Sequence, residues 1–502
     1  MTRIVRYDKA CVVMDEDDEK LFRALDNHLS FQVQGAEHSK AFKGYINERG
    51  EEVTWDGRKH LMSCTGRFPP GLLPRVLKFY ENRHKPIEVI DRRSPQLEGR
   101  PKDILPTLQE MGKVPRAYQN QAVQSAKTKD RGIIKICTGG GKSLVATSLI
   151  AELGKPAIIY VIGKDLLYQM HGLFESVFGK STKIGIIGDG KCEIGEINVA
   201  TVWSVGQALG LKKKKVTLDD EGSGEEKKID PAKFRAIKEM LLACAVHIFD
   251  ECHLASCDTV QTIVRNLKGE HVYGMSASPW RDDGSDLLIE GALGDRIVDI
   301  PARELIDTNY LVEPIIRFLA VPPPPKRLKR QYQTIYSKYI IENEVRNKMV
   351  VKGAKKLVEQ GYPTLVLFHA IKHGKILHEM LSDELPVALL SGKDSSKKRE
   401  QVKQDLESGK ISCIIASKIF DIGIDLPSLS GLIVAGGGKS SVRALQRIGR
   451  VIRPFPGKTQ SAVIDFVDQA PYLIEHSQRR FEIYSQEFEA TWPKERGGLT
   501  RP

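Results

Sequence analysis

Residues 136–143 read Ile136-Cys137-Thr138-Gly139-Gly140-Gly141-Lys142-Ser143, and this stretch decides the fold. It follows the apolar run Gly132–Ile136, which is typical of a buried strand, and it opens a helical stretch. Glycines between a strand and a helix let backbone N–H groups curl around a phosphate, and the amino terminus of the helix adds positive potential. The alternative, a flexible glycine loop with no ligand, does not account for this order of strand, loop and helix.

The residue types of this loop predict a binding site for ATP and Mg²⁺. A lysine at position 142 can reach the β- and γ-phosphates, and the hydroxyl of a serine at position 143 can ligate Mg²⁺. Ile136 replaces the first glycine of the general GxxxxGK[ST] pattern. The predicted ATP-binding residues of the loop are Thr138, Gly139, Gly140, Gly141, Lys142 and Ser143.

An acidic pair follows a second apolar run. Asp250-Glu251-Cys252-His253 comes directly after Val246–Phe249. At the end of a parallel strand, Asp250 would hold Mg²⁺, partly through water, and Glu251 would orient and deprotonate the attacking water. An Asp-Glu pair alone is weak evidence, but downstream of the glycine loop, with a strand before each, it predicts a nucleotide-hydrolysing site.

A basic helical stretch, Gln446-Arg447-Ile448-Gly449-Arg450-Val451-Ile452-Arg453, is the third element. Residues four and seven apart share one face of a helix, so Gln446, Arg450 and Arg453 align. Such a face predicts catalytic residues in which Arg450 and Arg453 stabilise the charge of the transition state as arginine fingers. A solvated basic face is the alternative, and it would be preferred if the glycine loop were absent.

The distribution of apolar runs predicts an α/β protein with two parallel sheets. Short β-branched runs alternate with helical stretches before and after Pro322-Pro323-Pro324-Pro325. The charged segment Lys212–Lys228 cannot bury a core, and we read it as a solvated insertion rather than a nucleic-acid contact. The predicted segments are an α+β module at 1–95, a first α/β domain at 104–314 with an insertion at about 207–232, a linker at 315–345, a second α/β domain at 346–470, and a helix and tail at 471–502.

Composition restricts the class of protein. The formal net charge of +12 favours a polyanionic partner. No apolar run is long enough to span a membrane and the amino terminus lacks a signal-peptide pattern, so we expect a soluble, cytoplasmic protein without a membrane partner. Cys252, His253 and Cys257 lie close together, but a fourth ligand with zinc-finger spacing is missing, and the eight cysteines form no CxxC pair.

Together these motifs resemble the superfamily 2 helicases over about residues 104–467, in the order of that family. In helicases Thr-Gly-x-Gly-Lys-Ser is the core of the glycine loop, so Ile136 fits. The resemblance implies two RecA-like motor domains that close on ATP and step along one strand. It assigns adenine recognition to Gln119, further ATP contacts to Gly423 and Asp425, coupling of hydrolysis to domain movement to Ser276 and Ser278, and DNA-backbone contacts to Lys164, Thr201, His369 and Ser391.

The finer resemblance is to the phage UvsW group, with XPB and RecG as more distant functional relatives. It is carried by Asp250–Ala255, Trp55-Asp56-Gly57-Arg58 and Phe68-Pro69-Pro70-Gly71-Leu72. It implies remodelling of branched DNA in recombination, repair and replication: fork regression, branch migration of Holliday junctions, and unwinding of D-loops and R-loops. It also implies 3′ to 5′ movement, a monomer, recombination or replication proteins as partners, and the host cytoplasm. Ser276–Gly284 is closer to the XPB pattern, and the insertion is not one we associate with UvsW.

In this reading the amino-terminal module is a small α+β DNA-binding domain that grips duplex DNA near a branch. Residues 53–95 hold nine Lys or Arg against four acids, and among the basic residues Arg58 and Lys59 are predicted DNA contacts. The alternative is that these charges are solvated. For Trp55 we favour a place in the core of the module, since large aromatic side chains usually pack.

Three other functions remain open. An RNA helicase would have a similar motor, but no RRM, KH or zinc-knuckle pattern is visible. A duplex translocase could track DNA without unwinding it, and a partner could supply the nuclease that this sequence does not show. A non-enzymatic ATP-gated clamp is disfavoured because Lys142, Glu251, Arg450 and Arg453 are all present.

Overall fold

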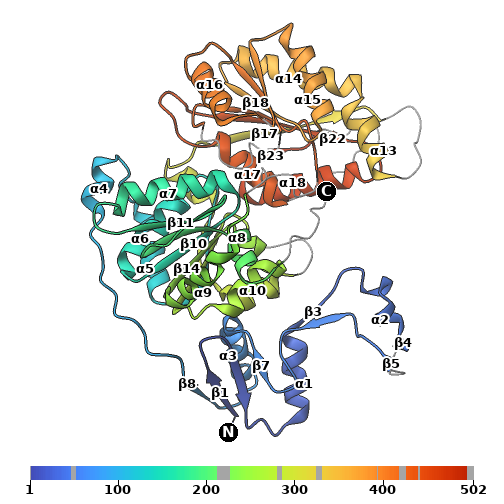
Figure 1. Ribbon diagram of the computed structural model, residues 1–502. Coiled ribbons are helices and arrows are strands. Elements are labelled where there is room, and N and C mark those ends of the chain that lie inside the picture. The colour runs from blue at the N-terminus through green and yellow to red at the C-terminus, as the bar shows by residue number, and fades with distance from the viewer. Residues whose placement is uncertain are drawn as a thin grey trace. The chain divides into compact units, whose positions relative to one another are not determined.

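The computed structural model describes residues 2–46, 52–211, 227–279, 285–323, 331–392, 394–417, 426–438 and 441–493. The chain forms two compact units (Figure 1). Among the described residues, the first unit contains 2–135, 141–211 and 227–299. The second contains 136–140 and the residues from 300 onward.

The amino-terminal module of the first unit is built on a four-stranded sheet of order β7-β2-β1-β8. Ile4 and Phe68 of this sheet share a core with Leu25 and Val76 of two helices. This core explains the apolar spacing in the sequence of the module. The elements are β1 (Thr2–Arg6), β2 (Cys11–Met14), α1 (Glu19–His28), β7 (Arg67–Phe68), η2 (Pro70–Leu72), α3 (Leu73–Glu81) and β8 (Ile87–Asp91).

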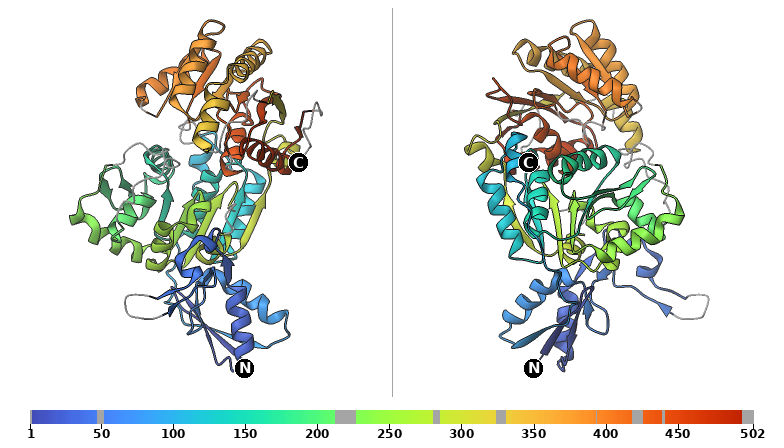
Figure 2. Two further views of the ribbon diagram at one scale, coloured as in Figure 1. Left: turned by 90° about the vertical axis from the view of Figure 1, so that its right-hand side faces the viewer. Right: turned by 60° about the vertical axis from the view of Figure 1, so that its left-hand side comes forward.

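Residues 30–46 and 52–60 form an arm that extends away from this sheet in all three views (Figures 1 and 2). Its base is the antiparallel pair of β3 (Ser30–Gln32) and β6 (Arg58–His60). Trp55 lies half-buried near this base, and its indole N–H donates to the Arg58 carbonyl at 2.6 Å. The remaining elements of the arm are η1 (Ala36–His38), α2 (Lys40–Lys43), β4 (Tyr45–Ile46) and β5 (Glu52–Val53).

The rest of the first unit is an eight-stranded sheet of order β12-β11-β13-β10-β14-β15-β9-β16. The central strands pair in parallel, and β12 is antiparallel to β11. The strands β10 and β13 are buried along their whole length, as continuous apolar runs predict.

The strands of this sheet are β9 (Arg131–Ile136), β10 (Ala157–Val161), β11 (Ile184–Gly188), β12 (Lys191–Glu193), β13 (Ile197–Thr201), β14 (Val246–Asp250), β15 (His271–Ser276) and β16 (Arg296–Ile300). The helices are α4 (Leu105–Glu110), α5 (Ala117–Lys127), α6 (Lys142–Leu153), α7 (Lys164–Phe178), α8 (Val202–Ala208), η3 (Pro231–Lys233), α9 (Phe234–Ala243), η4 (Cys252–Ser256), α10 (Asp258–Asn266) and α11 (Asp286–Leu293).

Charged contacts and a connecting strap join the amino-terminal module to this sheet within the first unit. Arg75 of α3 forms a two-pronged ion pair with Glu290 of α11, at 2.7 and 2.6 Å. In the strap between β8 and α4, the Arg100 N–H donates to the Gly154 carbonyl and the Lys102 N–H donates to the Ala151 carbonyl. The module is therefore anchored to the sheet that carries the glycine loop.

The second unit contains a seven-stranded sheet of order β19-β20-β18-β21-β22-β17-β23, in which the strand pairs are parallel. Its strands are β17 (Pro314–Val321), β18 (Thr364–Leu367), β19 (Val387–Leu390), β20 (Cys413–Ala416), β21 (Gly431–Ile433), β22 (Ser461–Asp468) and β23 (Ala490–Thr491). Its helices are α12 (Ala302–Asp307), α13 (Tyr332–Tyr336), the π-helix η5 (Ser337–Ile341), α14 (Glu344–Glu359), α15 (Ile371–Ser382), α16 (Ser396–Glu407), α17 (Ser441–Val451) and α18 (Leu473–Glu487).

The α/β class with parallel sheets is confirmed, but the predicted linker at 315–345 needs a correction. Strand β17 occupies its first residues and lies between β22 and β23 inside the sheet. The proline run that suggested a connector follows this strand. Burial alternates along the strand, with Ile316 and Phe318 buried, so its sequence shows only a short apolar run. Among the described residues, no helix is long and apolar enough to cross a membrane.

Candidate nucleotide site

The predicted nucleotide-binding residues lie at the carboxyl ends of three adjacent strands. Strand β9 ends at Ile136, β14 at Asp250 and β15 at Ser276, and the register pairs Asp250 with Met275 and Ser276 with Lys135. Because these strands are parallel, their ends meet at one edge of the sheet. The glycine loop, the acidic pair and the first predicted coupling serine therefore come together.

The glycine loop turns the chain from β9 into α6. Gly139 and Gly141 have φ of +88° and +77°, a region that favours glycine. The Gly140 N–H donates to the Cys137 carbonyl at 3.1 Å and tightens the turn. The helix that follows begins at Lys142, so its free N–H groups face the loop, as binding of a phosphate requires.

Gln119 packs directly on this loop. A Cβ added to Gly141 would lie under 3.0 Å from the Gln119 side-chain nitrogen. The Gln119 Oε1 accepts a hydrogen bond from the Arg116 N–H at 2.8 Å and caps the start of α5. The structure thus places Gln119 beside the loop, while its recognition of adenine stays a prediction.

The acidic pair faces the lysine of the glycine loop. Burial and the neighbouring Glu251 charge raise the pKa of Asp250, and Lys142 opposes this rise. Burial would also raise the pKa of Glu251, but the adjacent His253 and the charge of Lys142 outweigh it and hold that pKa below its ordinary value. Glu251 is therefore a carboxylate at neutral pH, as a base requires.

The backbone and two side chains fix Glu251. Its φ of +49° lies in the left-handed region, which is rare for a residue with a side chain and is often found at functional sites. The Ser276 hydroxyl donates to Glu251 Oε2 at 3.4 Å, and His253 Nδ1 lies 3.3 Å from the same oxygen. The contact with Ser276 links the acidic pair to the predicted coupling segment, in which Ser278 N–H donates to Ser276 Oγ at 3.2 Å.

These donors fit ATP with Mg²⁺. Gly141 leaves no room for a side chain beside Gln119, and Lys142 supplies a cation at the loop. The Thr138 hydroxyl is buried and has no hydrogen-bond partner within the described parts of the chain, so a ligand could satisfy it. Ser143, at the start of α6, and Asp250 are the oxygen donors that would hold Mg²⁺.

The predicted arginines belong to the second unit. Arg450 and Arg453 lie half-buried on and just after α17, and Val312 N–H donates to the Ile452 carbonyl at 2.8 Å at the end of this helix. The side chain of Gln446 and the whole of Gly423 and Asp425 lie outside the described residues, as does most of the charged insertion.

The structure corrects two of the predicted DNA contacts. Thr201 is 1% exposed, and its hydroxyl caps α8 by accepting from the Ser204 N–H at 3.3 Å, so its side chain is not accessible to DNA. Arg58 is half-buried and donates to the Ser30 hydroxyl at 2.8 Å and the Ser30 carbonyl at 3.1 Å, so it holds the base of the arm together. Lys59 is exposed on the same strand.

The other predicted DNA contacts lie at loop and helix ends. Lys164 is half-buried and begins α7, and His369 is half-buried and follows β18. Ser391 donates from its hydroxyl to Asp394 at 3.1 Å. Sequence reasoning missed the role of His253 in holding Glu251, although the residue stood within the quoted acidic motif.

Two segments of the chain match known protein families. Residues 112–281 match the family of the type III restriction enzyme res subunit, and residues 348–454 match the helicase conserved C-terminal domain. The chain is 26% identical to putative helicase 22 of Sulfolobus islandicus filamentous virus over 397 residues, which cover 74% of the chain and 67% of that protein. It is 25% identical to the ATP-dependent DNA helicase uvsW of Enterobacteria phage T4 over 510 residues, which cover 94% of each.

Among solved structures, S. cerevisiae Dbp5 bound to RNA and ADP BeF3 shares the fold, with a TM-score of 0.50 and 17% identity over 76% of this chain and 89% of that one. The two matched domains, the two RecA-like sheets and the glycine loop with its acidic pair define a motor that uses ATP and Mg²⁺. The chain belongs to the superfamily 2 helicases. Within that superfamily it is a homologue of the phage UvsW helicase.

Proposed function

We propose that this helicase is an ATP-driven DNA helicase that moves on branched DNA and remodels it. Its reactions would be fork regression, branch migration of Holliday junctions, and unwinding of D-loops and R-loops in recombination, repair and replication. We further propose 3′ to 5′ movement by a monomer in the host cytoplasm, with recombination or replication proteins as partners. The proposals on branched DNA rest on the resemblance to the UvsW group and on the full-length similarity to its phage T4 member, whereas the 3′ to 5′ direction rests on more distant XPB relatives, whose names carry that polarity.

The main support for the proposed ATP hydrolysis is the environment of the Glu251 carboxylate. It is a carboxylate at neutral pH, and Ser276 and His253 fix its oxygen. Glu251 would orient the attacking water and take its proton, while Lys142 would neutralise phosphate charge. Mg²⁺, when bound, supplies further charge neutralisation at the phosphates. Arg450 and Arg453 would stabilise the charge that develops in the transition state.

The amino-terminal module supports the DNA assignment. The full-length relative aligns over 94% of this chain, whereas the two family matches begin only at residue 112. Of the nine basic residues at 53–95, Arg58, Arg75 and Arg93 are half-buried and hold the fold together through hydrogen bonds and ion pairs. The other six are exposed and could meet phosphates: Lys59, Arg67, Lys78, Arg83, Lys85 and Arg92.

One substrate panel tests the proposed function. ATPase and strand separation are measured on single strand, duplex, fork, Holliday junction and RNA hairpin. We expect forks and junctions to give the highest stimulation. Equal stimulation by plain duplex without strand separation would mean a translocase, and preference for the RNA hairpin would refute the DNA assignment.

A triple variant tests the role of the module. Lys59→Ala, Lys78→Ala and Lys85→Ala together should weaken binding to the fork and flatten its salt dependence, because fewer counterions are released. The matched control replaces three exposed lysines of the first α/β sheet region, Lys180, Lys238 and Lys268. An equal loss in both triple variants would show that overall charge, not the module, sets the affinity.

A further inference from the structure

The loop Ala435–Gly438 connects β21 to the helix α17, which carries the predicted arginine fingers. Its four consecutive backbone carbonyls each accept a hydrogen bond from a side chain, and the four side chains come from four different helices. The donors are Arg346 of α14 to Ala435 at 2.7 Å, Tyr336 of α13 to Gly436 at 2.8 Å, Arg447 of α17 to Gly437 at 3.4 Å and Arg480 of α18 to Gly438 at 2.7 Å.

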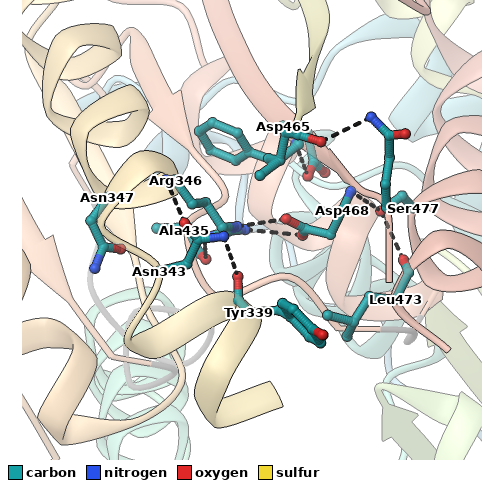
Figure 3. Close-up of polar contacts among 12 residues, drawn as sticks. Tyr339, Asn343, Arg346, Asn347, Ala435, Asp465, Asp468, Leu473 and Ser477 are labelled. Carbon is teal, nitrogen blue, oxygen red and sulfur yellow. Dashed lines mark hydrogen bonds and ion pairs between the residues drawn. The ribbon is translucent and has the colours of Figure 1, made fainter. Parts of the chain in front are cut away.

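The two arginines from outside α17 are themselves immobilised. Arg346 is 0% exposed, lies 4.7 Å from the centre of the Phe466 ring, and donates to both Asp468 oxygens at 2.7 and 3.2 Å (Figure 3). Arg480 is 1% exposed and donates to both Asp465 oxygens at 2.9 and 2.8 Å. Each guanidinium is thus fixed by a carboxylate of β22 and keeps a further N–H for the loop.

Stability alone does not explain this arrangement. Apolar side chains of similar volume often replace a buried ion pair without loss of stability, so two buried pairs beside one loop favour a geometric role. The loop has little stiffness of its own, since Gly437 and Gly438 adopt φ of +59° and +110°. Its position therefore depends on the four donors together with the Gly436 N–H, which donates to the Leu367 carbonyl at 2.8 Å.

The loop is linked to α17 directly, because Arg447 of that helix donates to the Gly437 carbonyl. That helix begins at Ser441, with only two residues between it and Gly438, and it packs against α18, from which Arg480 reaches the loop. The far end of α17 is held separately by the hydrogen bond from Val312 to Ile452. A displaced loop would tilt the helix about that fixed end and would move Arg450.

We propose that Tyr336, Arg346 and Arg480 are positioning residues for ATP hydrolysis, which hold α17 where Arg450 and Arg453 can act. This inference rests on the proposed role of those two arginines as fingers. Tyr336 is the residue to test, because its hydroxyl can be removed without leaving a buried charge unpaired. Burial raises the pKa of that hydroxyl, so it stays a donor across the neutral range.

The experiment compares Tyr336→Phe with Tyr273→Phe. The Tyr273 hydroxyl belongs to a buried tyrosine and also donates to a backbone carbonyl, that of Lys129 at 2.7 Å, but it lies in the first unit. Displacement of a catalytic group by 1 Å can lower a rate by about 100-fold. With three donors remaining, we expect kcat of the DNA-stimulated ATPase to fall about tenfold in Tyr336→Phe, with KM for ATP within about twofold of wild type. Tyr273→Phe should keep the wild-type kcat.

A double-mutant cycle separates positioning from a structural role. In a background with Arg450→Ala and Arg453→Ala, Tyr336→Phe should cause no further loss of the residual single-turnover rate, because it acts through those arginines. The same tenfold loss in that background would overturn the proposal. So would a wild-type kcat for Tyr336→Phe while Arg450→Ala is impaired. Full turnover in the double-arginine variant would instead refute the proposed fingers, and with them the basis of this inference.

Discussion

Replacement of Glu251 by Gln tests the assignment of the base most directly. The change keeps the shape of the side chain and an oxygen that can accept the Ser276 hydroxyl, now 3.4 Å from Glu251 Oε2. It removes the negative charge that faces Lys142 and the basicity needed to take a proton from water. The left-handed backbone of this residue and the loop around Gly141 stay as they are.

The expected loss follows from the role of a general base, which contributes about 10² to 10⁴ in rate. We expect kcat to fall about 10³-fold, which is about 4 kcal/mol of activation free energy. ATP affinity should be unchanged or slightly higher, because Lys142 loses a carboxylate that competes with phosphate for its charge.

Two measurements check this result: single-turnover hydrolysis of radiolabelled ATP, and equilibrium binding of a fluorescent ATP analogue. Turnover within threefold of wild type would refute Glu251 as the base. Loss of nucleotide binding together with turnover would show that the residue binds the nucleotide instead. A second variant, Ser276→Ala, should lower kcat by about three- to tenfold, because it removes one hydrogen bond that orients the carboxylate.

Two further predictions concern the amino-terminal module. Gly71→Ala would bring a Cβ under 3.0 Å from backbone carbonyls of α11, so we expect a destabilisation of about 1–3 kcal/mol by thermal unfolding, whereas Gly172→Ala, in open space inside α7, should stabilise by about 0.5–1 kcal/mol. The pKa of His60 is raised mainly by its hydrogen bond with Asp56 and also by Asp26, so its contribution to stability is complete below the unfolded pKa near 6.5 and is lost as pH rises through the folded pKa. Amide exchange in the base of the arm, corrected for intrinsic rates, should therefore be faster at pH 8.5 than at pH 6, and a flat profile in the wild type would contradict this.

The grouping of the nucleotide-site residues could be predicted because they belong to two short motifs, each of which directly follows a strong strand signal. The glycine loop follows β9 directly, and the acidic pair ends β14. Parallel strands bring their carboxyl ends to one edge, so two local motifs suffice to place Lys142 next to Asp250 and Glu251.

Contacts between distant segments could not be predicted in the same way. Charge predicts a DNA contact at Arg58, but Ser30 on the partner strand accepts its hydrogen bonds. Motif order assigns Thr201 to DNA, but the start of α8 uses its hydroxyl as a cap. In both cases a polar side chain that could contact a phosphate forms hydrogen bonds with a nearby backbone or hydroxyl group instead. That partner can be identified only from the fold.

Two glycine-rich loops of this chain show why sequence alone does not separate chemistry from positioning. Thr138–Ser143 reads TGGGKS and Ala435–Ser440 reads AGGGKS, and each loop follows a strand and precedes a helix. In the first loop, the carbonyls of Cys137 and Gly141 accept hydrogen bonds from N–H groups of the same loop and helix. In the second, side chains of other helices donate to three of the four carbonyls from Ala435 to Gly438, and Arg447 of the following helix donates to the fourth. The side chains that distinguish the two loops therefore lie outside the motif. A variant such as Tyr336→Phe changes one of them, and it should affect α17 although no sequence motif includes Tyr336.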